Sequence, residues 1–117
     1  MQTRNIEFQH EDERGWFKQI VSGKWEQMNI FLTKKGHQRG GHYHKNTTEC
    51  FYVLDGEIEL EVNNVATGEY STHKSRTGGC FVVDPYESHT VTALADTIIV
   101  VLLSKKFNPK DTDIFEK

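Results

Sequence analysis

The stretch Gly36-His37-Gln38-Arg39-Gly40-Gly41-His42-Tyr43-His44-Lys45-Asn46-Thr47-Thr48-Glu49 decides how the chain is interpreted. His42 and His44 are two residues apart, so on a β-strand both side chains point to the same face. Glu49 follows a short polar link and opens the next apolar segment. Two imidazoles and one carboxylate on neighbouring strands can converge on one point. A distant imidazole, His89, can then complete a four-ligand metal site inside a small β-barrel.

The spacing from Gly36 to Gly56 reads G-x5-H-x-H-x4-E-x6-G and resembles the first motif of the cupin superfamily at every ligand position. A weaker second match runs from Gly78 to His89, where Asp84 stands in the usual proline place and Tyr86 replaces a usual glycine. The histidine itself is kept. The resemblance covers roughly residues 36–93, most of an ordinary small domain. It implies an all-β, single-domain cupin (jelly-roll) barrel with the ligand set His42, His44, Glu49 and His89.

Length and charge narrow the class of protein. The 117 residues fit one domain, 1–117, with a core over about 16–104 and a polar C-terminal tail over 105–117. A formal net charge of −3 without a basic stripe argues against a nucleic-acid partner. The first residues are charged, and the longest apolar run, 98–103, is far too short to cross a bilayer. We therefore expect a cytoplasmic protein with no membrane partner, whose Cys50 and Cys80 stay reduced.

The hydrophobic pattern predicts strands throughout, with turns at glycines. Glu57 to Val62 alternates acids and aliphatics, which is typical of a strand with one buried face. It follows Glu49 to Leu54 through Asp55-Gly56, a strong signal for a β-hairpin. On the same alternation, Phe51 and Val53 share the inner face with Glu49. The remaining strands are expected over 16–21, 25–33, 69–76, 80–83, 89–93 and 97–104.

Several strands are apolar on both faces. Cys50, Tyr52 and Leu54 would face outward, and the run 98–103 has no polar face. Strands of this kind need cover on the outside as well. A second subunit would supply that cover, so the sequence predicts a homodimer.

Imidazole and carboxylate ligands together suit a divalent ion such as Zn, Fe, Mn, Ni or Co, whose identity the sequence leaves open. Four protein ligands leave positions free for water or substrate on a six-coordinate ion, which is typical of a catalytic or ligand-binding site. The alternative is that the histidines are ordinary polar residues at a strand end. The joint spacing of all four residues favours the metal site.

The upstream sequence resembles the deoxysugar-nucleotide epimerase branch of the cupins. Asp12-Glu13-Arg14-Gly15-Trp16-Phe17, Gln27-Met28-Asn29 and Arg39-Gly40-Gly41-His42-Tyr43 match the patterns D-x-R-G-x-F, Q-x-N and R-G-L-H-Y. The Arg-Gly-Gly-His stretch also resembles sugar-nucleotide 3,4-ketoisomerases. Carried over, the resemblance implies that four residues bind a sugar-type substrate: Arg39, Gln27, Asn29 and Arg14. Amides suit sugar hydroxyls and a guanidinium fork suits a diphosphate, although ordinary strand and turn polarity would also explain these residues.

The chain departs from that branch at one position that matters. In metal-free epimerases the position of His42 is the base and the position of His44 is usually glutamine. Here His44 completes a ligand set, so His42 is expected on the metal, and the catalytic base and acid stay unassigned. The sequence predicts a metal-dependent isomerase or epimerase that abstracts a proton next to a carbonyl. An Fe(II)-dependent dioxygenase and a non-enzymatic sugar-binding cupin are the alternatives.

Overall fold

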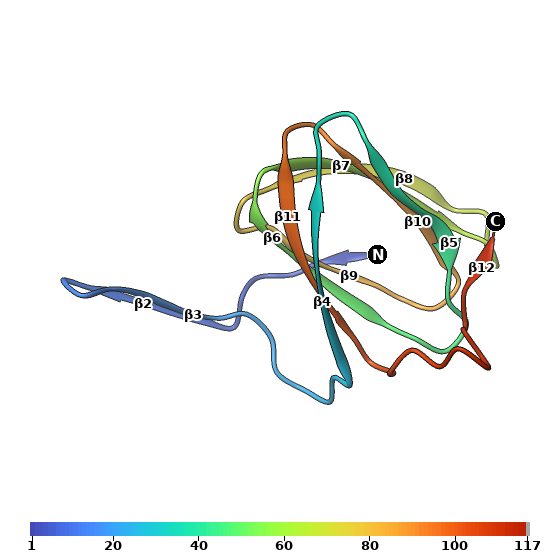
Figure 1. Cartoon of the computed structure of the whole chain (residues 1–117), viewed down its shortest axis with the longest axis horizontal. Coiled ribbons are helices and arrows are strands. Elements are labelled where there is room, and N and C mark those ends of the chain that lie inside the picture. Colours follow the sequence, from blue (N-terminus) through green and yellow to red (C-terminus); the bar gives the residue numbers. More distant parts are fainter. Residues whose placement is uncertain (117) are drawn as a thin grey trace.

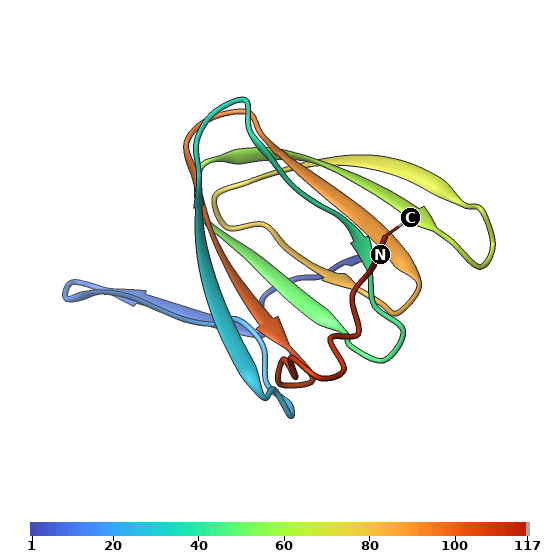
Figure 2. The same cartoon turned by 45° about the vertical axis from the view of Figure 1, so that its right-hand side comes forward.

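A computed structural model describes residues 1–116, which contain strands and turns and no helix, so the predicted all-β class is confirmed. Two five-stranded antiparallel sheets face each other, in the orders β1-β9-β6-β11-β4 and β12-β5-β10-β7-β8, and β2-β3 form a separate hairpin. Figures 1 and 2 show the two sheets around a common interior. The strands are β1 Gln2–Thr3, β2 Phe8–Asp12, β3 Gly15–Gln19, β4 Gln27–Thr33, β5 Gln38–Tyr43, β6 Glu49–Asp55, β7 Glu57–Asn64, β8 Tyr70–Arg76, β9 Cys80–Val83, β10 Glu87–Ala93, β11 Thr97–Leu103 and β12 Phe115–Glu116.

The core lies between the two sheets and is built from alternate residues of the long strands. In β7 the aliphatic side chains are buried and the glutamates are more exposed, as the alternation predicted. Phe51 and Val53 point inward with Glu49, also as predicted. The main core cluster comprises Phe51, Val53, Ile58, Leu60, Val62, Phe81, Val83, Val91, Ile99 and Val101.

The predicted hairpin between residues 49–54 and 57–62 is wrong. β6 pairs with β9 and β11, whereas β7 pairs with β8 and β10, so Asp55-Gly56 carries the chain from one sheet to the other. Gly56 has φ of +122°, and a Cβ there would overlap the Thr97 hydroxyl. An Asp-Gly pair indicates a sharp reversal of the chain. Here the reversal is a corner that connects the two sheets, and the strands on either side of it do not pair with each other.

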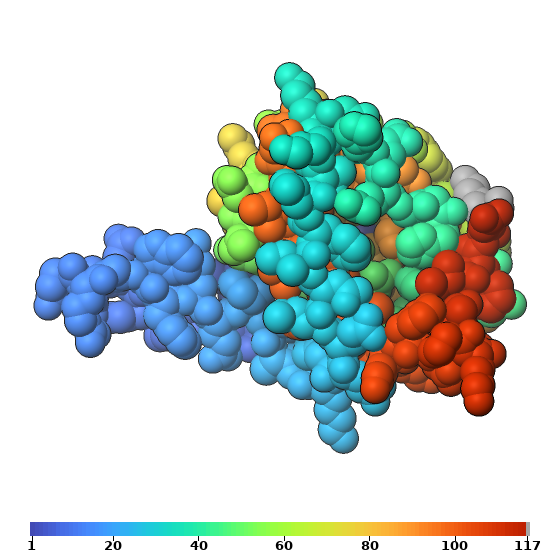
Figure 3. All heavy atoms as spheres, viewed as in Figure 1, coloured from blue at the N-terminus to red at the C-terminus, as the bar shows by residue number. Residues whose placement is uncertain are grey.

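The N-terminal residues form an arm outside the barrel. The strand expected over 16–21 is β3, and it pairs with β2, a strand that the sequence analysis did not predict. The arm projects away from the two sheets (Figures 1 and 3). Its aromatic residues Phe8, Trp16 and Phe17 are exposed. Apart from β1, the barrel sheets therefore begin at Gln27 and not near residue 16, because the expected first strand finds its partner within the arm.

The outer face of the first sheet is covered in part by the chain itself. Cys50 is 2% exposed and lies in a second cluster with Cys80 and Val82, against which Ile20, Val21 and Trp25 pack. The two cysteines are free thiols with their sulfur atoms 3.8 Å apart. The cover does not reach β4, where Met28, Ile30 and Leu32 are more than half exposed, or Leu54 at the end of β6.

The segment after Leu103 is not a free polar tail. It crosses the end of the barrel and finishes as β12, which pairs with β5 through Phe115–Tyr43 and Glu116–His42 (Figure 2). Phe115 stacks on Tyr43, with ring centroids 5.6 Å apart, and so holds the end of the segment against β5. Residues 1–116 offer no helix with the length and apolarity that a membrane crossing requires.

Candidate functional site

Four side chains from distant parts of the sequence meet at one end of the barrel interior. His42 is near the end of β5, and His44 is the first residue after that strand. Glu49 begins β6, and His89 lies in β10. One nitrogen or carboxylate oxygen from each lies within 4.8 Å of those of the others. His44, Glu49 and His89 are buried, and His42 is half-buried. We call His42, His44, Glu49 and His89 the His/Glu cluster.

The Gly40-Gly41 pair sets the register that brings two of these rings together. His42 and His89 stand directly opposite each other in the β5–β10 ladder, with ring centroids 4.9 Å apart. The register shifts at the next step, where Gly40 faces Thr90. Both glycines have positive φ, +110° and +77°, and a Cβ on Gly40 would overlap the His89 carbonyl. The glycine pair therefore allows a β-bulge that aims His42 at His89.

Hydrogen bonds fix the orientation of two of the rings. Nδ1 of His44 lies 2.6 Å from the Asp113 carbonyl oxygen, and Nδ1 of His89 lies 3.1 Å from the Glu87 carbonyl oxygen. A carbonyl oxygen only accepts, so both Nδ1 atoms carry hydrogen. The Nε2 atoms then face the same carboxylate oxygen of Glu49, at 2.7 Å and 3.3 Å.

The residues of the His/Glu cluster shift one another's pKa values. Burial works against the Glu49 carboxylate, but hydrogen bonds from His44 and His89 outweigh it and lower the pKa of Glu49 to about 2. Burial also opposes charge on His44, yet the bond to Glu49 raises the pKa of His44. Burial, with repulsion from the other two rings, lowers the pKa of His42. Glu49 is therefore ionised at neutral pH, and His42 is neutral.

The donor set fits a divalent cation. A neutral histidine ring with hydrogen on Nδ1 has a lone pair on Nε2. The lone pairs of His44 and His89 would therefore point at the Glu49 carboxylate oxygen and be repelled by it, unless a proton or a cation lies between them. Histidines that bind metals commonly donate their other N–H to a carbonyl or carboxylate, as His44 and His89 do here. Ligands at about 2.1 Å from an ion lie at most about 4.2 Å apart, so the atoms would need to move inward only slightly.

A cavity of about 640 Å³ opens in front of the cluster. It lies between β4, β5 and the C-terminal segment, where Figure 3 shows the surface hollowed. Its walls combine polar groups and apolar side chains such as Phe31, Phe51 and Leu103. A second hollow of about 760 Å³ lies under the N-terminal arm, but the His/Glu cluster does not border it. The first cavity is therefore the candidate substrate site, because the His/Glu cluster borders it.

Three of the four residues predicted to bind substrate line this cavity: Gln27, Asn29 and Arg39. The Gln27 amide donates to Asn29 at 3.1 Å and accepts from the backbone N–H of Phe107 at 2.8 Å. The Arg39 guanidinium donates to Thr33 at 2.8 Å and to the Leu32 carbonyl at 3.0 Å. These contacts hold the polar groups in place on the wall.

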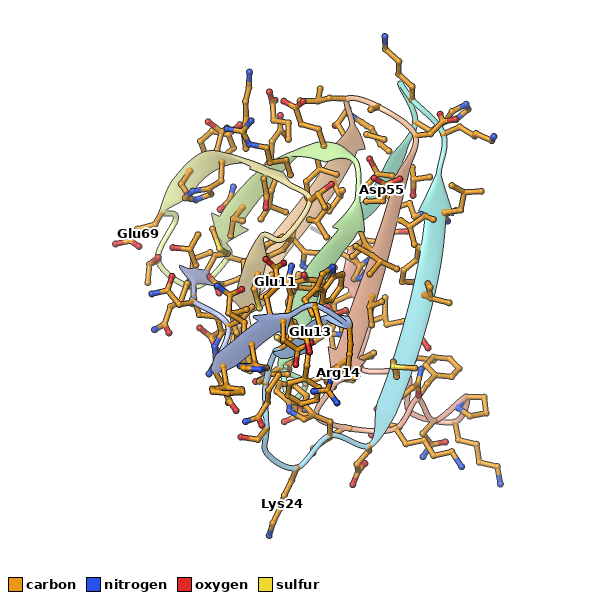
Figure 4. The ribbon with its side chains drawn as sticks, turned by 90° about the vertical axis from the view of Figure 1, so that its left-hand side faces the viewer. Glu11, Glu13, Arg14, Lys24, Asp55 and Glu69 are labelled. Carbon is orange, nitrogen blue, oxygen red and sulfur yellow. The ribbon has the colours of Figure 1, made fainter. Side chains whose placement is uncertain are left out.

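Arg14 is not brought to the cavity. It lies at the turn between β2 and β3, where Figure 4 shows it on the projecting arm beside Glu13. Its side chain is 83% exposed and pairs with Asp12 at 2.7 Å. Within one chain, Arg14 and the His/Glu cluster are separate, because the segment that carries Arg14 folds as an arm and not as a barrel strand.

The contribution of the C-terminal segment to the site was not predicted from the sequence. Lys105 and Lys106, assigned from the sequence to a polar C-terminal tail, line the cavity with Phe107 and Ile114, and Asp113 contacts His44. Ile114-Phe115 is a signal that could have indicated this, since an apolar pair after a polar stretch suggests that the chain docks there. By residue type a tyrosine could serve as a catalytic acid, but Tyr43, Tyr52 and Tyr86 are not among the cavity-lining groups of residues 1–116.

The two facing sheets, with a cavity at one end of their common interior, define a cupin-type jelly-roll barrel. The chain belongs to the family described as the polysaccharide biosynthesis C-terminal domain, whose model matches residues 10–115.

One curated relative is UDP-2-acetamido-2,6-beta-L-arabino-hexul-4-ose reductase of Pseudomonas aeruginosa. It is 28% identical over 111 residues, which are 91% of this chain and 30% of the relative. The chain thus spans less than a third of that relative's length.

Solved structures share the fold at low identity. QdtA, a sugar 3,4-ketoisomerase of Thermoanaerobacterium thermosaccharolyticum in complex with TDP, matches with a TM-score of 0.80 and 16% identity, over 99% of this chain and 87% of that one. A dTDP-4-dehydrorhamnose 3,5-epimerase of Sulfolobus tokodaii matches with a TM-score of 0.77 and 19% identity, over 93% and 78%. At these identities the likeness concerns the fold alone.

Proposed function

We propose that this chain is a metal-dependent cupin domain that acts on a nucleotide-activated sugar, as an isomerase or epimerase that removes a proton next to a carbonyl. The observation that carries the proposal is the convergence of His42, His44, Glu49 and His89 at a cavity lined by amide and guanidinium groups. The relatives support the substrate class, because their names include a UDP-sugar reductase, a ketoisomerase bound to TDP and a dTDP-sugar epimerase.

The residues divide into two groups by their chemistry. The His/Glu cluster would hold the ion, which would supply a Lewis acid able to stabilise negative charge on a substrate oxygen. Zn, Fe, Mn, Ni and Co all accept this mixture of imidazole and carboxylate. Gln27 and Asn29 would bind sugar hydroxyls, and Arg39, whose guanidinium also lies against β4, would contact a phosphate or hydroxyl oxygen. Arg14 is left out of this assignment.

A second candidate is proton transfer without a metal, and the state of His42 favours it. His42 is half-buried beside the cavity, and its lowered pKa keeps the ring neutral and able to accept a proton. Glu49 and His44 would then be a buried ion pair behind the base. The two candidates differ in one respect, since removal of metal abolishes the first activity and spares the second.

The test is deuterium incorporation from solvent into keto-sugar nucleotides, followed by mass spectrometry. Protein purified without an affinity tag would be incubated with a panel of these compounds, before and after treatment with a chelator. Exchange that disappears with the metal and returns on its addition supports the first candidate, and exchange that survives supports the second. Oxygen consumption would indicate the dioxygenase, and saturable binding without exchange would indicate a binding module.

We also propose that two copies associate through the exposed face of β4. Met28, Ile30 and Leu32 alternate along this strand and are 67%, 63% and 53% exposed. Exposed aliphatic side chains in a row at a sheet edge are typical of an interface.

A further inference from the structure

Asp113 makes contacts that set it apart from the rest of the C-terminal segment. Its carboxylate accepts hydrogen bonds from the backbone N–H of Lys45 at 2.9 Å, the backbone N–H of Asn46 at 3.0 Å and the hydroxyl of Thr47 at 2.8 Å. Its own carbonyl accepts from Nδ1 of His44 at 2.6 Å. One residue therefore holds both the 45–47 turn and the ring that precedes it.

The backbone of Asp113 is in an uncommon conformation. Its φ is +52°, in the left-handed region that Asp and Asn tolerate better than other residues with a side chain. The carboxylate bonds to the turn offset this unfavourable conformation, and they keep the carbonyl directed at His44. Thr47 is 5% exposed and His44 is 6% exposed, so these two partners of Asp113 are shielded from water, whereas Lys45 and Asn46 are exposed.

The contact between the Asp113 carbonyl and Nδ1 of His44 also determines the state of Nε2, the other ring nitrogen. A carbonyl acceptor places hydrogen on Nδ1 of His44 and leaves Nε2 directed at Glu49. If the carbonyl moved away, the ring could rotate or take the opposite tautomer, with hydrogen on Nε2. That tautomer cannot donate a lone pair from Nε2 to an ion.

We propose that Asp113 is a positioning residue that sets the tautomer and orientation of His44, and thereby the affinity of the His/Glu cluster for a divalent cation. The part about affinity rests on the proposed function, whereas the part about the tautomer does not. The inference makes the C-terminal segment a working part of the site and not a tail.

The variants are chosen to separate the carboxylate from the backbone. Asp113→Gly keeps a residue that readily adopts a positive φ but removes every hydrogen bond that the carboxylate accepts, including the one from the Asn46 side-chain amide at 3.4 Å. Asp113→Asn also tolerates positive φ and keeps one side-chain oxygen as acceptor. Asp111→Gly is the matched control, because Asp111 lies in the same segment and borders the same cavity, and the same charge is lost.

The first readout is the tautomer of His44 in metal-free protein, from nitrogen-15 to proton correlation of the ring at a pH where the ring is neutral. We expect hydrogen on Nδ1 in the wild type and in Asp111→Gly, and a mixture of tautomers in Asp113→Gly. Asp113→Asn should restore most of the wild-type signal. A wild-type tautomer in both Asp113 variants would overturn the inference.

The second readout is titration with Co(II), followed by its visible absorption. Loss of a group that orients a metal-binding histidine commonly weakens binding about 10- to 100-fold, and we expect a loss of that order in Asp113→Gly but not in Asp111→Gly. Equal affinity in these two variants would contradict the inference. A wild type that binds no Co(II) would instead remove the proposed metal site, and the tautomer experiment would still decide the role of Asp113.

Discussion

His44 and Glu49 show how single residues prepare this site. Each is buried, each contacts the other at 2.7 Å, and their pKa values move apart, so that the carboxylate is ionised and the ring readily takes a proton. A divalent cation would replace that proton. The His/Glu cluster is therefore a place where positive charge is needed, whether a proton or a metal ion supplies it.

Removal of one ring should remove the metal and leave the fold. We expect His44→Ala and His89→Ala to lose most of the bound metal, because each change removes one of four donors. The strands on either side are held by their own ladders, so circular dichroism should remain that of a β-barrel. Elemental analysis checks the metal content, with His73→Ala as the control, because His73 is a half-buried histidine of β8 outside the His/Glu cluster. Unchanged metal in both cluster variants would remove the assignment.

Protons and metal should compete at the site. The pKa of His44 is raised in the folded protein, so its contribution to the stability of the metal-free form is complete below the unfolded value of 6.5 and is lost as the pH rises through the folded value. Glu49 behaves oppositely: its contribution is present above the unfolded value of 4.5 and is lost as the pH falls toward about 2.

The rise in melting temperature on adding metal should therefore grow as the pH increases from about 5.5 to about 8.5, because the ion must displace the proton on His44. Thermal unfolding at several pH values, with and without Zn²⁺, measures it. A metal-induced gain in stability that does not change with pH would argue against displacement of a proton.

At the scale of elements, the β5–β10 bulge is the device that aligns the site. Gly40→Ala should be severely destabilising, because the added Cβ would overlap the His89 carbonyl at a φ of +110°. Gly41→Ala meets no atom within 4 Å and carries only the strain of a positive φ. We expect a loss of about 1–2 kcal/mol for Gly41→Ala and about 3 kcal/mol or more for Gly40→Ala.

Urea unfolding of the metal-free variants measures both values and separates steric overlap from strain. Equal losses in the two variants would show that the close approach of Gly40 to His89 has no energetic weight.

The elements also show what the sequence could reveal. Short-range patterns located the long strands of the barrel and the two motifs, because alternation and His-x-His spacing are local properties, but they missed the two-residue strands β1 and β12. They did not reveal strand pairing. Asp55-Gly56 predicted a reversal correctly, but whether the next strand pairs or crosses to the other sheet depends on contacts with Thr97 and β10. The partner of residues 16–21 and the docking of Asp113 likewise depend on tertiary contacts that local patterns do not contain.

For the whole molecule, the outer surface of the first sheet divides into a covered part and an open part. Ile20, Val21 and Trp25 cover the region around Cys50, a role that the sequence analysis gave to a second subunit. The face of β4 stays open. The dimer prediction therefore now concerns Met28, Ile30 and Leu32.

A charge placed on that face should separate the subunits. We expect the wild type to be a dimer at micromolar concentration and Ile30→Lys to be a monomer, because burying an unpaired ammonium in an apolar interface is strongly unfavourable. Val65→Lys, in the turn between β7 and β8, is the control for added charge at an exposed apolar residue. Light scattering measures the mass. A monomeric wild type, or a dimer that survives Ile30→Lys, would count against this face.

The proposed function depends on a cation bound by the His/Glu cluster. The most direct measurement is equilibrium dialysis of tag-free protein against Zn²⁺ or Co²⁺, with the bound metal counted per chain in the wild type and in His44→Ala. We expect one ion per wild-type chain, and almost none in the variant at the same free metal concentration. A wild type that retains no metal, or a variant that retains as much, would contradict it.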